Sequence, residues 1–182
     1  MAAKKANEVK PTKMFEVFGP YDIEPTLAKS ARWIEKDQDK FWAMQSGPGQ
    51  LRRRIGCYVF AIRASKGVRP VYVGKTWKAF EDEIFGSHQL YYYNAELADI
   101  SKGTPVMFFV AYPQGKGITN RKMIRDVEEF LIQVAVAKNP DLRNVHNIGE
   151  KKWGIRGVIR RGKGKATESS TKFKNALGLH TS

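Results

Sequence analysis

The stretch that decides the fold is GCYVFAIRASKGVRPVYVG, residues 56–74. Residues 57–64 and 70–74 have the β-branched and aromatic content of strands, and each run carries a tyrosine, Tyr58 and Tyr72. Ser65-Lys66-Gly67 lies between the two runs. Two strand-like runs joined by a short polar segment with a glycine predict a β-hairpin.

The segments after the hairpin alternate between helix and strand. Residues 80–85 and 91–100 favour short helices, and the apolar run 106–111 predicts a buried central strand. Residues 120–138 form the clearest predicted helix, which Asn139-Pro140 ends. Its apolar face comprises Met123, Ile124, Val127, Phe130, Leu131, Val134 and Ala135.

The segments outside this core divide the chain. Residues 1–13 are rich in lysine and predict a loose start, whereas apolar residues recur at near-helical spacing within residues 24–44 and predict a helix there. The sequence therefore predicts an α/β fold, a small sandwich whose three-stranded sheet (the hairpin plus the central strand) is flanked by helices. We expect residues 1–50 to form a helical N-terminal extension, residues 51–150 the domain, and residues 151–182 a basic C-terminal extension.

The formal charge of +14 and the pI near 9.9 are the strongest compositional signals. Such an excess attracts a polyanion, so nucleic acid is the expected partner, and an acidic protein is the alternative. No apolar run reaches the roughly 18 residues that cross a bilayer, and the basic start leads into no apolar segment. We expect no membrane partner and a cytoplasmic location.

The C-terminal extension allows two interpretations. From residue 151 onward it holds nine Lys or Arg residues and one acidic residue, Glu168, with Trp153 and Phe173 among them. Cations near aromatic rings suit phosphate contact and base stacking. Equally, the tail keeps the protein in solution while its aromatic rings dock on the domain.

Two residue patterns limit the chemistry. The only cysteine, Cys57, leaves no Cys or Cys/His set for structural zinc, so a bound metal needs oxygen ligands, which indicates magnesium or manganese. Gly74-Lys75-Thr76 is not a phosphate loop, because that motif needs a glycine where this chain has Arg69.

A wider set of residues suggests a family. The short motifs Gly56-Cys57-Tyr58 and Val71-Tyr72-Val73-Gly74 are followed by the long predicted helix. This helix carries Glu128 ahead of a Leu-Ile pair, and Asn144 comes after it. In this order and spacing the chain resembles the GIY-YIG nuclease superfamily, over roughly residues 55–147, about half of its length. The resemblance implies a metal-dependent endonuclease that hydrolyses phosphodiester bonds in nucleic acid, here DNA in preference to RNA, with one Mg²⁺ or Mn²⁺ ion.

The resemblance also implies roles for five residues. Tyr58 activates water, Tyr72 and Asn144 orient the phosphate, Glu128 holds the metal, and His88 protonates the leaving group. Each has a plainer interpretation: the tyrosines pack in the sheet, Asn144 forms a turn, and His88 is structural or exposed. For Glu128 the alternative is an ion pair with Arg125 or Lys122, although it borders the apolar face of its helix. A tyrosine base also needs a positive pocket, because free tyrosine titrates near pH 10.

One departure from the family pattern puts catalysis in doubt. Active members carry an arginine on the helix after the second motif, but residues 77–85 contain none and include Glu81-Asp82-Glu83. The expected substitutes are other cations of the chain, and further cations of the tail are expected to hold the nucleic-acid backbone. The substitutes are Lys75, Lys78, Arg63, Arg52, Arg53 and Arg54, and the tail cations are Arg160, Arg161, Lys163 and Lys165. A domain that binds nucleic acid without cutting it is therefore the main alternative.

Overall fold

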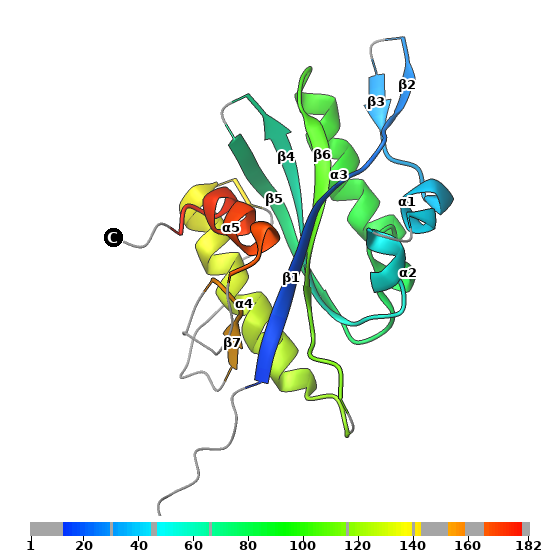
Figure 1. Cartoon of the computed structure of the whole chain (residues 1–182). Helices are drawn as coiled ribbons and strands as arrows, with labels where there is room; N and C mark the ends of the chain where they lie inside the picture. Colours follow the sequence, from blue (N-terminus) through cyan, green and yellow to red (C-terminus); the bar gives the residue numbers. More distant parts are fainter. Residues whose placement is uncertain are drawn as a thin grey trace, which may run out of the picture.

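The computed structural model describes residues 13–29, 31–44, 47–65, 67–115, 117–139, 141–142, 153–158 and 166–179. The strands are β1 (Lys13–Asp22), β2 (Thr26–Ala28), β3 (Ala31–Trp33), β4 (Gly56–Ala64), β5 (Gly67–Thr76), β6 (Thr104–Ala111) and β7 (Trp153–Ile155). The helices are α1 (Asp39–Ala43), a 3₁₀ turn η1 (Pro48–Leu51), α2 (Phe80–Glu83), α3 (Ser87–Asp99), α4 (Arg121–Lys138) and α5 (Glu168–Ala176). The fold class is α/β, as predicted (Figure 1).

In the described ranges the main sheet has five strands in the order β5-β4-β6-β1-β7, and β2 pairs with β3 in a separate small sheet. The first four strands are antiparallel to their neighbours, and β7 is parallel to β1. The hairpin β4–β5 and the central position of β6 are confirmed. The prediction of three strands is wrong, because β1, from the expected N-terminal extension, and β7, from the expected C-terminal extension, also join the sheet.

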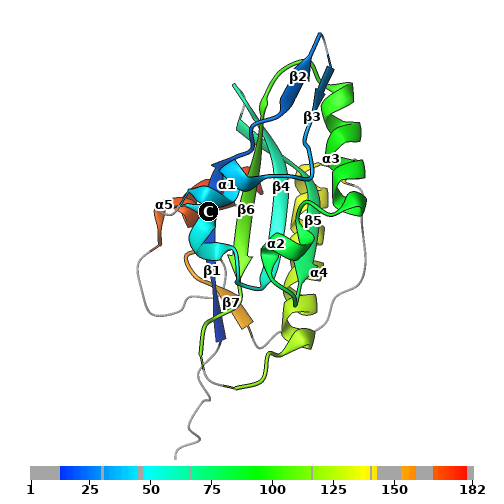
Figure 2. The same ribbon diagram turned by 90° about the vertical axis from the view of Figure 1, so that its right-hand side faces the viewer.

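Both faces of the central strands are buried, because side chains alternate along a strand. Cys57, Val59 and Ala61 of β4 face the cluster that contains residues of α4 and α5. Tyr58, Phe60 and Ile62 face the cluster that contains residues of α1, α2 and α3. Helices thus cover the sheet on both sides (Figures 1 and 2).

The helix predicted over residues 24–44 is wrong. This segment instead forms the β2–β3 hairpin and the short helix α1. Lys29 has a φ of 54°, a left-handed conformation that interrupts a helix, and Leu27 is 69% exposed, so the apparent apolar stripe is not one buried face. Asn94 of α3 fixes the segment after β3: its Oδ1 accepts from the Ile34 amide at 2.7 Å, and its Nδ2 donates to the Ile34 carbonyl at 3.1 Å.

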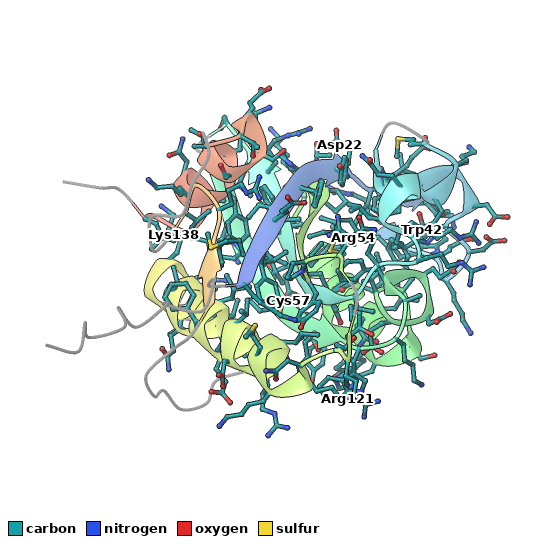
Figure 3. All side chains as sticks on the ribbon, turned by 60° about the horizontal axis from the view of Figure 1, so that its bottom comes forward. Asp22, Trp42, Arg54, Cys57, Arg121 and Lys138 are labelled. Carbon is teal, nitrogen blue, oxygen red and sulfur yellow. The ribbon has the colours of Figure 1, made fainter. Side chains whose placement is uncertain are left out.

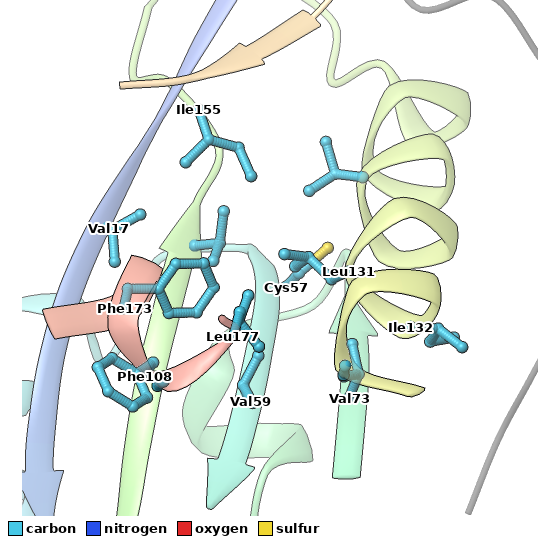
Figure 4. Close-up of a cluster of buried hydrophobic side chains, with 14 of the residues drawn as sticks. Val17, Cys57, Val59, Val73, Phe108, Leu131, Ile132, Ile155, Phe173 and Leu177 are labelled. Carbon is cyan, nitrogen blue, oxygen red and sulfur yellow. The ribbon is translucent and has the colours of Figure 1, made fainter. Parts of the chain in front are cut away.

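The predicted helices at residues 80–85, 91–100 and 120–138 are confirmed as α2, α3 and α4. Asn120 caps α4, because its side chain accepts a hydrogen bond from the Met123 amide at 3.0 Å. Helix α5 lies in the expected basic extension, and its Phe173 is fully buried against Phe108 of β6, with ring centroids 5.3 Å apart (Figure 4). At this aromatic residue the tail docks on the domain.

Candidate functional site

A pocket of about 360 Å³ collects most of the predicted catalytic residues at the edge of the sheet. Because no strand of the described residues lies beyond β5, side chains from both faces of the sheet can reach the same space at this edge. The lining comprises Tyr58 of β4, Tyr72, Gly74, Lys75 and Thr76 of β5, Trp77 and Lys78 after it, Glu83 of α2, His88 and Gln89 of α3, and Glu128 of α4.

The two tyrosines lie side by side on the face toward α3. Tyr58 is fully buried and Tyr72 is 7% exposed, with ring centroids 6.3 Å apart and planes 24° apart. Tyr58 pairs in register with Gly74, and a Cβ at Gly74 would lie 2.3 Å from the Tyr58 ring carbon Cζ. The glycine of the second motif is therefore required by the tyrosine of the first.

The electrostatics of the pocket hold both tyrosines protonated. Burial raises the pKa of Tyr58 well above 10, and the charges of Glu83 and Glu128 add to the rise. Burial and the same two carboxylates raise the pKa of Tyr72 to about 12, although a hydrogen bond with Tyr58 offsets part of the rise. A positive pocket was expected to lower these pKa values, and in the protein alone the two carboxylates act in the opposite direction.

Glu128 and Lys75 form an ion pair across the wall of the pocket. Lys75 Nζ contacts Glu128 Oε2, and the two side chains are 27% and 11% exposed. Burial raises the pKa of Glu128, although the hydrogen bond and charge of Lys75 offset part of the rise. The ion pair that the structure shows for Glu128 is thus with Lys75 of β5, and Arg125 of its own helix acts on the carboxylate only through its charge.

The start of α3 closes the other side of the pocket. Gln89 is 7% exposed, and its Nε2 donates to Glu83 Oε1 at 2.7 Å. A hydrogen bond from Gln89 also acts on Tyr58. His88 borders the pocket and meets Tyr92 edge-on, with ring centroids 5.1 Å apart. Gln89 and Glu83 were not among the sequence candidates, and only the positions around His88 could have drawn attention to them.

The family resemblance implies a magnesium ion, and the side chains of the pocket determine whether one could be held there. Magnesium prefers oxygen ligands and keeps several waters. Within the described ranges no group of three or more His, Cys, Asp or Glu side chains could hold a metal, so the chain offers few ligands. Glu128 offers one mostly buried carboxylate that already lies beside the cation of Lys75. The residues fit one ion held through a single carboxylate, with Lys75 as its competitor.

A cation that the sequence reasoning missed lies against Trp77, one of the residues that line the pocket. Arg121 is the first residue of α4, where Figure 3 labels it, and its Cζ lies 5.7 Å from the centre of the Trp77 ring. Lys75 Nζ lies at the same distance from that ring. Arg121 precedes Glu128 by seven residues, two helical turns, so the two residues share a side of α4. This spacing of seven residues was the sequence signal that could have identified Arg121 as a site residue.

Other predicted cations lie elsewhere. Arg52 contacts Glu81, and Arg53 Nε lies 2.8 Å from Glu81 Oε1. Arg54 donates to the Tyr112 carbonyl at 2.9 Å. Arg53 and Arg54 line a separate hollow of about 490 Å³ together with Lys13 and Tyr112.

Arg63 stands near the far end of β4, where its guanidinium lies 2.7 Å from Asp22. Five residues of strand, roughly 16 Å, separate it from Tyr58. Asn144, Arg160, Arg161, Lys163 and Lys165 lie outside the described residues, so their predicted roles stay predictions.

Comparisons with known proteins add no family assignment: no family model, curated protein or solved structure matches the chain. Of the helices in the described ranges, none has the length and apolar character needed to cross a membrane. The case for a function therefore depends on the pocket and on the motifs that form it.

Proposed function

We propose that this chain is a metal-dependent endonuclease of the GIY-YIG type that hydrolyses phosphodiester bonds in DNA. The observation that carries the proposal is the convergence of Tyr58, Tyr72, His88 and Glu128 on one pocket with Lys75 and Lys78. These residues come from four separate elements and from both faces of the sheet. Packing alone gives no reason for a phenol pair, an imidazole and a buried carboxylate to share one polar hollow.

The cations of the pocket bind the phosphate. Lys75 and Lys78 line the pocket, and Arg121 lies over the ring of Trp77, which also lines it. A preorganised cation near the reacting phosphate stabilises the charge that develops during hydrolysis. Arg121 thus takes the place of the arginine that is absent between residues 77 and 85. In this chain the arginine is thus supplied by α4 and not by the helix after the second motif.

The two tyrosines together activate the attacking water. Tyr58 is fully buried, so it acts through its hydrogen bond with Tyr72, the more exposed phenol. A magnesium ion held by Glu128 would supply positive charge that polarises the phosphate and favours deprotonation of nearby water or phenol groups. For Glu128 to accept it, Lys75 leaves the carboxylate and turns to the phosphate. His88, at the rim, protonates the leaving oxygen.

A second candidate function is nucleic-acid binding without cleavage. The contact between Lys75 and Glu128 favours it, because this ion pair occupies the carboxylate that a metal needs. The absence of the family arginine favours it too. In this alternative the same cations bind the backbone and no bond is broken.

A cleavage assay separates the two functions. Purified protein is incubated with single-stranded, duplex and branched DNA and with RNA, with magnesium or manganese and with a chelator. We expect metal-dependent products on DNA, which Glu128→Ala abolishes and Glu129→Ala, a loss of the same charge at the next residue of α4, does not. Absence of products on every substrate eliminates the enzyme. Cleavage that survives Glu128→Ala eliminates this site.

Salt dependence tests the alternative of an acidic protein partner. Binding to nucleic acid that weakens steeply with salt reports release of counterions by phosphate contacts. We expect such a slope for the wild-type protein, and a shallower one after Lys75→Ala or Arg121→Ala. No retention on nucleic acid at low salt would favour the protein partner.

A further inference from the structure

Trp77 is an exposed aromatic ring at a pocket that is otherwise polar. Among the described residues, the large apolar side chains with substantial exposure are Leu27, Met44, Trp77, Tyr91 and Ile118. Of these only Trp77, 39% exposed, lines the pocket of the two tyrosines. An indole ring in contact with water loses apolar burial, so its place beside the reacting groups suggests a ligand that covers it.

The backbone around Trp77 is fixed. Thr76 is 4% exposed, and its Oγ1 accepts from the Lys78 amide at 3.0 Å, which closes the turn that carries Trp77. Lys75 Nζ and Arg121 Cζ each lie over the ring, 5.7 Å from its centre. The turn therefore presents a flat aromatic ring in contact with two cations. Arg121 is exposed and can leave the ring for a phosphate when another group takes its place.

We propose that Trp77, with Lys75 and Arg121, is a binding site for one unpaired nucleobase next to the phosphate that the pocket holds. Aromatic rings between cations bind single-stranded nucleic acid in this way, because every base has a face for stacking and every nucleotide a phosphate for the cations. A base inside a duplex offers no free face. The inference depends on the proposed function only for the phosphate, and it specifies the substrate as a strand that is unpaired at the site.

Binding without cleavage tests this site directly. With a chelator present, the intrinsic tryptophan fluorescence is followed while a short oligothymidylate is added, and again with an abasic oligomer of equal length that has the same phosphates and no bases. We expect the bases to quench the fluorescence and the abasic backbone not to. The chain has four tryptophans, so Trp77→Phe identifies the source: the quench must disappear in this variant.

Affinity separates stacking from a structural role. The preference for oligothymidylate over the abasic backbone should fall roughly 5- to 150-fold in Trp77→Ala, the range expected for one stacked base. Trp77→Phe, which keeps an aromatic face, should retain most of it. Tyr91→Ala, the loss of an exposed aromatic ring outside this pocket, should change nothing. Unchanged melting temperatures show that the variants fold.

Three results overturn the inference: equal affinity of the wild type for the two oligomers, an unaltered preference in Trp77→Ala, or an equal quench by a blunt duplex. Its failure is distinct from that of the nuclease proposal. Metal-dependent cleavage with no effect of Trp77 eliminates only the base site. A base-dependent quench without cleavage on any substrate leaves the base site in place and eliminates the enzyme.

Discussion

The two faces of the sheet have different compositions. The face toward α4 and α5 is mainly aliphatic, with Val59, Val73 and Leu131 among its buried residues. The face toward α1, α2 and α3 is rich in aromatic rings and includes Tyr58, Tyr72 and Tyr93. A buried phenol carries a polar hydroxyl group, whereas an aliphatic chain carries no polar atom. Both faces therefore stabilise the fold, and at the edge of β5 the aromatic face contributes phenol groups to the pocket while the aliphatic face contributes the ion pair of Lys75 and Glu128.

The largest expected effect is on the aliphatic face. Phe173→Ala should lower the free energy of unfolding by about 3–5 kcal/mol, because it empties a fully buried site against Phe108. Denaturant unfolding measures the change. Lys172→Ala, on the exposed side of α5, should stay within about 0.5 kcal/mol of the wild type. An equal loss in both variants would contradict the docking of α5 through Phe173.

A smaller loss is expected on the aromatic face, with a larger consequence for cleavage. Gly74→Ala places a methyl group 2.3 Å from the fully buried Tyr58 ring, so the ring must move. We expect a loss of about 1–3 kcal/mol in stability and loss of metal-dependent cleavage. Gly115→Ala, where a Cβ meets nothing within 4 Å, is the control. Normal cleavage by Gly74→Ala would show that the position of Tyr58 is unimportant.

Glu128→Gln should raise stability. Burial raises the pKa of Glu128, so its contribution to stability is complete below the unfolded pKa and is lost as pH rises through the folded pKa. At neutral pH the charged carboxylate therefore costs stability that a neutral glutamine does not. We expect a higher melting temperature at neutral pH and no gain in acid, with the exposed Glu24→Gln as the control. A lower melting temperature would mean that the ion pair with Lys75 outweighs the cost of burial.

The smallest expected effect is on the pH at which individual tyrosines titrate. Burial tends to raise the pKa of Tyr112, on the aliphatic face, but hydrogen bonds from Lys13 and the Asn120 backbone, together with the charge of Lys13, outweigh it and lower the pKa. Burial raises the pKa of Tyr72, on the aromatic face, to about 12. An alkaline titration of phenolate absorbance should lose an early component in Tyr112→Phe and a late one in Tyr72→Phe. If Tyr72 titrated before Tyr112, the environments described for the two side chains would be wrong.

Tyr72 also affects stability in alkali. Its raised pKa contributes stability that is complete below about pH 10 and is lost as pH rises through the folded value. Unfolding of the wild type should therefore become easier above about pH 10, and Tyr72→Phe should reduce this dependence. Melting temperatures across this range measure it.

The hairpin, the central strand and the long helix were predictable from local pattern. The hairpin has two strand-like runs around a short turn, and β6 is a continuous apolar run because both of its faces are buried. Strand β1 was overlooked although Phe15 and Val17 alternate with exposed or half-buried neighbours, a period-two signal. Its bulge between Phe18 and Tyr21 shortens that signal. The pairing of β7 with β1 is a long-range contact that no local pattern reports.

The sequence predicted the site residues that belong to a motif, but not the contacts between residues that are distant in the sequence. Tyr58, Tyr72, His88 and Glu128 do share one pocket. The contact between Lys75 and Glu128 joins a strand to a helix more than fifty residues away, which only the fold can reveal. Burial raises the pKa values of both tyrosines, and the charges of Glu83 and Glu128 add to the rise. Glu83 lies on α2, a segment that the sequence marked only by its lack of an arginine.

The position of the pocket at the edge strand β5 has a topological consequence. A site inside a tunnel or ring admits a polymer only through a free end. A site on the rim of a sheet meets the polymer from the side, at any point along its length. For the proposed enzyme, a covalently closed circle of single-stranded DNA should be cut as readily as a linear strand, and its first product should be a full-length linear molecule.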